Sequence, residues 1–201
     1  LETGRSVQKN KILRNVVTAI RRVPQPGAAA GAAVQASEDL QLRLWDTRQG
    51  ILKSPAAAVR AGPNQLICLD VSPDGHYVAC GSKGFSRENC EVKVFDLRAS
   101  LQELHSLPCA DQTIEALRHV GSDRCITASK DGHVRAVSLP SPKVVLERRS
   151  TKIGAAGYTA LGVSETGAAL CAWVGPEGVG LELLAWKDLR LDQQPTVLAT
   201  T

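Results

Sequence analysis

Alternating apolar and polar residues, separated by short polar turns, recur along most of the chain. The clearest case is segment 37–46, in which Leu40, Leu42 and Leu44 alternate with polar residues and a tryptophan. A period of two is typical of a β-strand that buries one face, and the acidic pair before it supplies residues for a tight turn. The segment therefore predicts a strand end, a turn and a second strand.

The same plan recurs farther along the chain. Ser37, Ser82 and Ser129 stand at intervals of about 45 residues, close to the period of one blade of a β-propeller. The equivalent position on the third strand of each unit holds Trp45, Phe95, Val137 and Trp186. We therefore predict an all-β propeller segment of about four four-stranded antiparallel blades. The predicted parts are an outer strand at 1–13, blade units at 14–50, 51–98, 99–139 and 140–191, and a tail at 192–201.

The residues around the first turn resemble those of the WD40 β-propeller family. In that family a serine, a turn aspartate, a strand tryptophan and a histidine from another loop form a hydrogen-bonded brace within each blade. Ser37, Asp39 and Trp45 match three of its members, and Ser129 and Asp131 match two members in the third unit. The resemblance implies a structural brace at these residues. We expect it to be incomplete in the first unit, which lacks the histidine, and absent in the third, which lacks the tryptophan.

A narrower resemblance covers residues 2–98. The sequences at 14–18, 37–45, 84–85, 90–92 and 95–98 are similar to those of the WD repeat-containing protein 31 group within the WD40 superfamily. That resemblance implies a cilium-associated trafficking or assembly factor, hence a cytoplasmic protein with the cilium as the more specific location. The Ala-Gly tract at 27–33 departs from the group's pattern.

A typical WD40 ring has about seven blades. We therefore expect the chain to be part of a seven- or eight-bladed ring, in which four blades alone would leave their first and last members with an exposed apolar face. Because only 3% of the residues are aromatic, alanine, valine and leucine must provide most of the packing.

Charge and hydropathy argue against two classes of partner. The net charge of +4 is scattered, and the compact basic groups are pairs such as Arg21-Arg22 and Arg148-Arg149. Such pairs do not make the basic patch typical of nucleic-acid binding. No run of 18 apolar residues is present, which argues against membrane insertion. We expect protein partners, with no nucleic acid and no inserted membrane segment.

Motifs for catalysis or metal binding are absent from the sequence. It contains no Gly-x-Ser-x-Gly, no phosphate-binding loop, no His-Glu-x-x-His and no Cys-x-x-Cys. The four histidines are scattered, with His76 in the second unit and His105, His119 and His133 in the third. Surface or strand-edge positions explain them best. Cys80 and Cys90 could pair across a connection or stay reduced in a cytosolic protein. We predict a non-enzymatic protein without cofactor or metal.

The connection at 83–90 is about five residues longer than its counterpart in the first unit. Phe85 and Arg87 are residue types found at binding hot spots, which makes this segment a candidate partner-binding loop. The alternative, which we favour for Phe85, is that its ring packs back onto its own blade. In either case we expect an exposed, mobile loop that the fold tolerates losing.

Two classes of function fit such a fold. The first is an interaction scaffold that binds partners through its loops. The alternative is an enzyme or small-molecule site in the central channel, which would require titratable groups at equivalent positions of successive inner strands. Thr18, Asp70, Glu115 and Thr159 do not form a matched set, so the sequence favours the scaffold.

Overall fold

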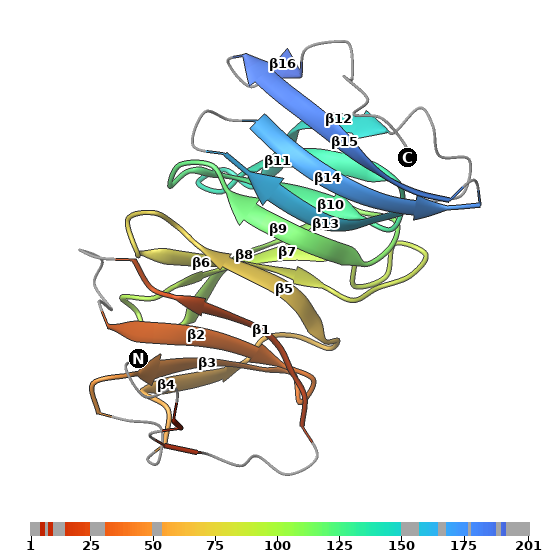
Figure 1. Ribbon diagram of the computed structural model, residues 1–201. Coiled ribbons are helices and arrows are strands. Elements are labelled where there is room, and N and C mark those ends of the chain that lie inside the picture. Colours follow the sequence, from red (N-terminus) through yellow and green to blue (C-terminus); the bar gives the residue numbers. More distant parts are fainter. Residues whose placement is uncertain are drawn as a thin grey trace.

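The computed structural model describes residues 5–6, 8–9, 15–24, 31–49, 54–149, 157–164, 168–176, 178–187 and 190–191. Within these ranges the chain forms sixteen β-strands. No helix capable of spanning a membrane occurs in this part of the chain. The strands build four antiparallel sheets of four strands each, and in every sheet the strands lie side by side in chain order (Figure 1). The predicted all-β propeller fold is confirmed.

Each sheet is a continuous stretch of sequence. Sheet 1 contains β1 (Val17–Arg22), β2 (Ala32–Ser37), β3 (Gln41–Asp46) and β4 (Ala57–Arg60). Sheet 2 contains β5 (Leu66–Val71), β6 (Tyr77–Ser82), β7 (Glu91–Asp96) and β8 (Gln102–Pro108). Sheet 3 contains β9 (Ile114–His119), β10 (Arg124–Ser129), β11 (His133–Ser138) and β12 (Lys143–Arg149). Sheet 4 contains β13 (Gly157–Val163), β14 (Ala168–Gly175), β15 (Gly178–Lys187) and β16 (Arg190–Leu191).

The sheets are offset by one strand from the units proposed from the sequence. The outer strand expected at the start of the second unit is β4, and it pairs with β3 through Leu44 and Ala57. Each outer strand thus completes the preceding sheet. The expected strand at 6–13 lies largely outside the described residues, and its described members do not form a strand. The tail at 192–201 lies outside them altogether.

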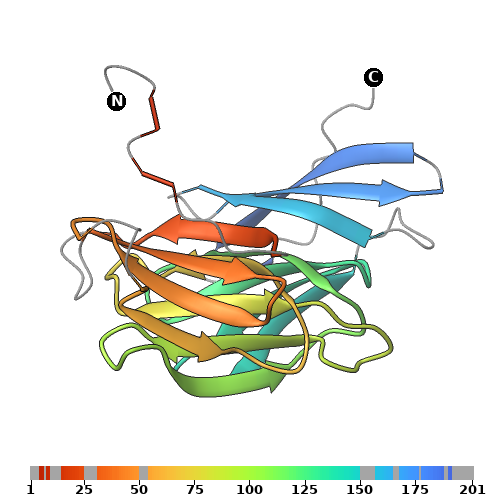
Figure 2. The same ribbon diagram turned by 90° about the horizontal axis from the view of Figure 1, so that it is seen from below.

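The first strand of each sheet is the inner strand. β1 contacts β5, β5 contacts β9, and β9 contacts β13, so the sheets succeed one another in an arc around these four strands (Figure 1). Figure 2 shows the strong twist of the strands within each sheet. This arrangement places the inner strands along a central channel and the outer strands β4, β8 and β12 at the periphery.

Three apolar clusters fill the spaces between adjacent sheets. The first joins sheets 1 and 2 and contains Phe95, which is 1% exposed. The second joins sheets 2 and 3 around Ile114 and Leu117. The third joins sheets 3 and 4 around Tyr158. Small and medium aliphatic side chains and cysteine thiols make up most of all three clusters, because few aromatic residues are present to fill them.

Exposed large apolar side chains gather on the two end sheets. Val16, Val17 and Ile20 are exposed on or beside β1, and Val179 and Leu181 are exposed on β15. These sheets contact one neighbouring sheet, whereas sheets 2 and 3 contact two. Among the described residues, this apolar surface lies on sheets that have a neighbouring sheet on one face only.

The six cysteines carry free thiols. Cys80 and Cys90, which could have formed a disulfide, are both buried and unbonded to each other. Burial raises the pKa of the Cys68 thiol to about 12 and that of Cys109 to about 11. At neutral pH these groups are thiols and pack as small apolar side chains.

Close packing between sheets 2 and 3 predicts a strong effect at Gly81. A Cβ atom there would lie 2.7 Å from both Cys68 Sγ and Ile114 Cγ2. We expect Gly81→Ala to lower the free energy of unfolding by about 1 to 3 kcal/mol, the usual cost of overpacking a core. Gly162→Ala is the matched control, because no atom of the described residues lies within 4 Å of a Cβ built at Gly162. Urea unfolding that ranked the two variants equally would contradict this packing.

Candidate functional site

The brace expected around Trp45 runs through a glutamine. Trp45, 7% exposed, donates from Nε1 to Gln35 Oε1 at 2.7 Å. Gln35 Nε2 in turn donates to Ser37 Oγ at 2.6 Å. Gln35 thus joins the tryptophan to the serine. Sequence reasoning missed it, although its position two residues before Ser37 on β2 places both side chains on one face of the strand.

Asp39 interacts with a strand arginine, Arg43, whose Nη1 also lies 3.5 Å from Ser37 Oγ of the brace. Arg43 Nη1 donates to Asp39 Oδ1 at 3.1 Å, and Asp39 Oδ1 also accepts from the Gln41 amide. Asn15 Oδ1 accepts from the Asp39 amide, so the region before β1 contributes an amide oxygen where the family has a histidine. Burial opposes ionisation of Asp39, but the hydrogen bonds from Arg43 and Gln41 lower its pKa. The turn is therefore held by a charge pair.

The third unit uses the same charge pair without the tryptophan. Asp131 donates from its amide to Ser129 Oγ at 3.2 Å, and its carboxylate lies 2.9 Å from Arg135 Nη1. Their side chains are 4% and 5% exposed, and Arg135 also binds Glu147 at 2.7 Å. Val137 stands at the position that Trp45 has in the first unit. An aspartate–arginine pair four residues apart holds this turn, as Asp39 and Arg43 do in the first unit.

The second unit has a lysine at the arginine position and no turn aspartate. Lys93 Nζ lies 3.2 Å from Glu103 and 3.5 Å from Glu91. Ser82 Oγ donates to backbone oxygens of the inserted loop and of Glu91, including Glu91 O at 3.1 Å. In this unit the loop at 83–90 replaces the tight turn, so contacts other than an aspartate–arginine pair hold the loop.

Phe85 is 73% exposed, so the expectation that its ring packs onto its own blade is wrong. Next to it the backbone is hydrogen-bonded to the following connection: Gly84 N donates to Thr113 Oγ1 at 3.2 Å, and Thr113 Oγ1 donates to Gly84 O at 3.0 Å. Arg87 binds Asp111 through Nε at 2.6 Å and through its amide at 3.0 Å. The loop, expected to be mobile, is therefore bonded to the segment that leads into sheet 3. A free loop could be deleted without cost, whereas this one carries contacts between sheets.

Beside this loop lies a hollow of about 500 Å³. Its lining includes Arg87, Asp111, His133, Arg135 and Glu147. His133 and Arg135 lie on β11, Glu147 lies on β12, and Asp111 lies in the segment before sheet 3. We name loop 83–90 together with this hollow the rim site.

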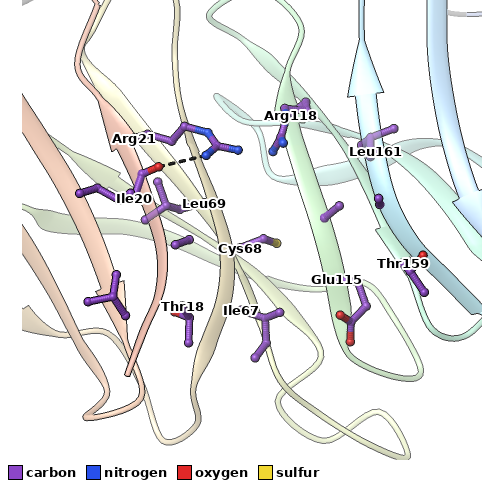
Figure 3. Close-up of a pocket in the computed structure, with 14 residues that line it drawn as sticks. Thr18, Ile20, Arg21, Ile67, Cys68, Leu69, Glu115, Arg118, Thr159 and Leu161 are labelled. Atoms are coloured by element: carbon purple, nitrogen blue, oxygen red, sulfur yellow. Dashed lines mark hydrogen bonds between the residues drawn. The ribbon is translucent and has the colours of Figure 1, made fainter. Parts of the chain in front are cut away.

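The central channel contains a second hollow, of about 420 Å³, lined by inner-strand residues (Figure 3). Each inner strand has a register shift at the same place: between Val17 and Ala19, Leu66 and Cys68, Ile114 and Ala116, and Tyr158 and Ala160. Counting from these shifts, one equivalent set is Thr18, Ile67, Glu115 and Thr159, and another is Arg21, Asp70, Arg118 and Gly162. Asp70 is therefore not equivalent to Thr18, Glu115 and Thr159, with which it was compared in the sequence. The equivalent residue of β5 is Ile67.

The second set brings charges together across three sheets. Arg21 Nε lies 3.3 Å from Asp70 Oδ1, and Asp70 Oδ2 accepts from the His119 amide at 2.9 Å. Arg21 and Arg118 point toward each other across β5 (Figure 3). Burial and the charge of Arg21 lower the pKa of Arg118. The channel therefore has a basic region that the sequence comparison did not find.

The channel groups are better suited to binding than to chemistry. Burial lowers the pKa of His119, which ends strand β9, and its ring nitrogens are buried with no hydrogen-bond partner among the described residues. The Cys68 thiol donates to Ile114 O at 3.4 Å, and Thr18 donates to Leu66 O at 2.6 Å. Neither is activated by a base. Within the described ranges no group of three or more His, Cys, Asp or Glu residues could hold a metal ion.

The charge pair of the third unit predicts a pH-dependent stability. Burial opposes ionisation of Asp131, but bonds from the Asp111 amide, the charge of Arg135 and the His133 amide outweigh it and lower the pKa below the ordinary 3.8. Its contribution is therefore complete above pH 3.8 and is lost as the pH falls through the lower value of the folded state. We expect Asp131→Asn to cost about 2 to 4 kcal/mol at pH 7, and progressively less in urea unfolding below pH 4. Asp123→Asn, at an exposed pair, is the control; equal losses in both variants would contradict the assignment.

The Trp45 contacts predict that the free energy of unfolding falls more for a small replacement than for an aromatic one. Trp45→Ala should lower the free energy of unfolding by about 3 to 5 kcal/mol, as for other buried aromatic truncations. Trp45→Phe keeps much of the packing but leaves Gln35 Oε1 without its donor, so it should cost about 1 to 2 kcal/mol. Chemical denaturation measures both. A loss below about 1 kcal/mol for Trp45→Ala would mean that this side chain does not support the core.

Comparison with known proteins agrees with the arrangement of the sheets. No protein-family model matches the chain. A crystal structure of RRP9 WD40 repeats matches with a TM-score of 0.73 at 14% identity, over 93% of this chain and 52% of that one. A structure of U3-55K matches with a TM-score of 0.71 at 14% identity, over 90% and 52%. The chain spans about half the length of these solved structures, and its fold is that of four consecutive blades of a WD40-type β-propeller.

Proposed function

We propose that this protein is a non-catalytic scaffold that binds protein partners through the rim site. The observation that carries the proposal is Phe85, which is 73% exposed on a loop bonded to the neighbouring sheet through Thr113 and Asp111. Phenylalanine and arginine are residue types found at interface hot spots. An aromatic ring presented by a fixed loop loses little conformational entropy on binding.

The hollow beside the loop gives the rim site a recognisable chemistry. Its lining carries both signs of charge, with Arg87 paired to Asp111 and Arg135 paired to Glu147. A partner that covered Phe85 would also meet these groups, which favours a surface of mixed charge. A strongly anionic polymer would meet the carboxylates, so we retain the prediction that nucleic acid is not the partner.

The cellular setting is a further part of the proposal. Cytoplasmic location and a cilium-associated trafficking or assembly role are supported by the resemblance of residues 2–98 to the WD repeat-containing protein 31 group. Imaging of the fluorescently tagged protein in ciliated cells tests this: enrichment at the cilium or its base supports the role, and uniform exclusion from both opposes it.

The channel remains the alternative location for a function. A small-molecule site there would use the hollow lined by Arg21 and Arg118. Thermal-shift screening with metabolites separates the two functions, because a large stabilisation with no protein partner would favour the channel.

The rim site predicts that Phe85→Ala weakens partner capture while leaving the fold unchanged. Because the ring is exposed, we expect a stability change within about 0.5 kcal/mol. Capture of partners should fall about fivefold or more in quantitative affinity purification from native cells. Val174→Ala is the matched control, since Val174 is exposed on β14 of sheet 4 and does not line the hollow. Equal capture by both variants and the unmodified protein would contradict the rim site.

A further inference from the structure

At one register position of the channel, residues of opposite charge alternate from β1 to β9, and the equivalent residue of β13 is uncharged. The equivalent residues of β1, β5 and β9 are Arg21, Asp70 and Arg118, whereas β13 has Gly162. The first two form an ion pair at 3.3 Å. Arg118 carries the third charge, and the fourth position holds Gly162 in place of an acidic residue.

The Arg118 guanidinium lacks a carboxylate partner among the described residues. Among those residues it makes one hydrogen bond, in which Arg118 Nη1 donates to the backbone oxygen of Leu117 at 2.7 Å. Asp70, the nearest acidic residue in the ring, is already bonded to Arg21 and to the His119 amide. A guanidinium has five N–H donors in a planar fork, so most of those of Arg118 are available.

Space for a ligand lies beside this group. The channel hollow extends from Arg118 to residues 159–161 of β13 (Figure 3). Gly162 follows these residues on the strand, and a Cβ built there would meet no described atom within 4 Å. Burial and the neighbouring Arg21 charge both disfavour the ionised form of Arg118 and lower its pKa. An anion in this space would offset both effects.

We propose that the space between Arg118 and Gly162 binds the carboxylate or phosphate group of a side chain in an acidic segment of a partner protein. Such an oxyanion would complete the alternation of charge and accept two hydrogen bonds from the guanidinium fork. This inference rests on the proposed scaffold function but uses a site separate from the rim.

The surroundings favour a single anionic group over a polyanion. Glu115 lies on the same strand at the other end of the hollow, where Lys130 Nζ binds it at 2.9 Å (Figure 3). Asp70 contributes a second negative charge. Apolar residues flank the basic end, among them Ile20, Leu69 and Leu161. One charged side chain between apolar contacts fits this lining, whereas a chain of phosphates would meet both carboxylates.

The test measures binding of labelled peptides by fluorescence anisotropy. The probes share one short sequence with a single central glutamate, phosphoserine or glutamine; inorganic phosphate serves as competitor. We expect the glutamate or phosphoserine peptide to bind and the glutamine peptide not to bind. The stronger of the first two identifies the source of the oxyanion, and equal binding of all three would overturn the proposal.

Two pairs of variants locate the site. Arg118→Gln should raise the Kd of the anionic peptide about tenfold or more, whereas Arg60→Gln, the same charge change on exposed β4, should leave it unchanged. Gly162→Asp places a carboxylate in the open space and should also abolish binding, whereas Gly162→Asn has the same shape without the charge and should retain it. Circular dichroism confirms the fold of each variant. Equal effects within either pair would overturn the proposal.

The outcomes also separate this inference from the scaffold function. Partner capture that depends on Phe85 but not on Arg118 would leave the scaffold standing and refute the channel site. Anionic-peptide binding that depends on Arg118, in a protein that captures no partner, would support the site and refute the scaffold.

Discussion

Packing between neighbouring sheets is the constraint on which the rest of this structure depends. A four-stranded sheet has two faces, and neither can be buried except against the next sheet of the arc. At the boundary of sheets 2 and 3 the fit is so close that Gly81 has no room for a methyl group beside Cys68 and Ile114. Because the chain has few aromatic residues, this burial comes from many small contacts. The position of every loop and channel residue follows from it.

Charge pairs fix the turns that project from this packed arc. In the first and third sheets an aspartate in the turn bonds an arginine four residues later, as Asp39 does with Arg43 and Asp131 with Arg135. The pair holds the turn against its own strand whether or not a tryptophan is present. In the second sheet the longer loop has no such pair, and Asp111 from the next connection bonds it instead. The rim site is thus a consequence of replacing a local contact by one between sheets.

The inner strands differ from the turns because their side chains meet others from separate sheets. A register shift at the same place in each inner strand brings Arg21, Asp70 and Arg118 to one level of the channel. Two arginines and one aspartate leave a basic excess in a partly buried site. Electrostatics in such a site are stronger than at the surface, which suits it to holding an anionic group. The rim and the channel therefore offer two different kinds of contact on one rigid support.

The sequence by itself determined the local structure. Alternation at 40–45 predicted β3, the serine and aspartate positions predicted the turns, and the repeat of about 45 residues predicted four successive sheets. These features depend on neighbours in the chain, so a single sequence reveals them. The assignment of Phe85 to an exposed position, and the role of Gln35 between Trp45 and Ser37, were decided by the tertiary structure.

The inner-strand residues Arg21, Asp70 and Arg118 show why the sequence determined local structure but not these contacts. Asp70 was compared with Thr18, Glu115 and Thr159, although Ile67 is the equivalent residue of β5, because the alignment of the inner strands with one another is not visible in the sequence. A shift of one residue changes which side chain faces a given neighbour. The bonds of Asp70 to Arg21 and to the His119 amide each join residues 49 positions apart in the chain. The sequence determined which strands form, and the packing of separate sheets decided which charges meet.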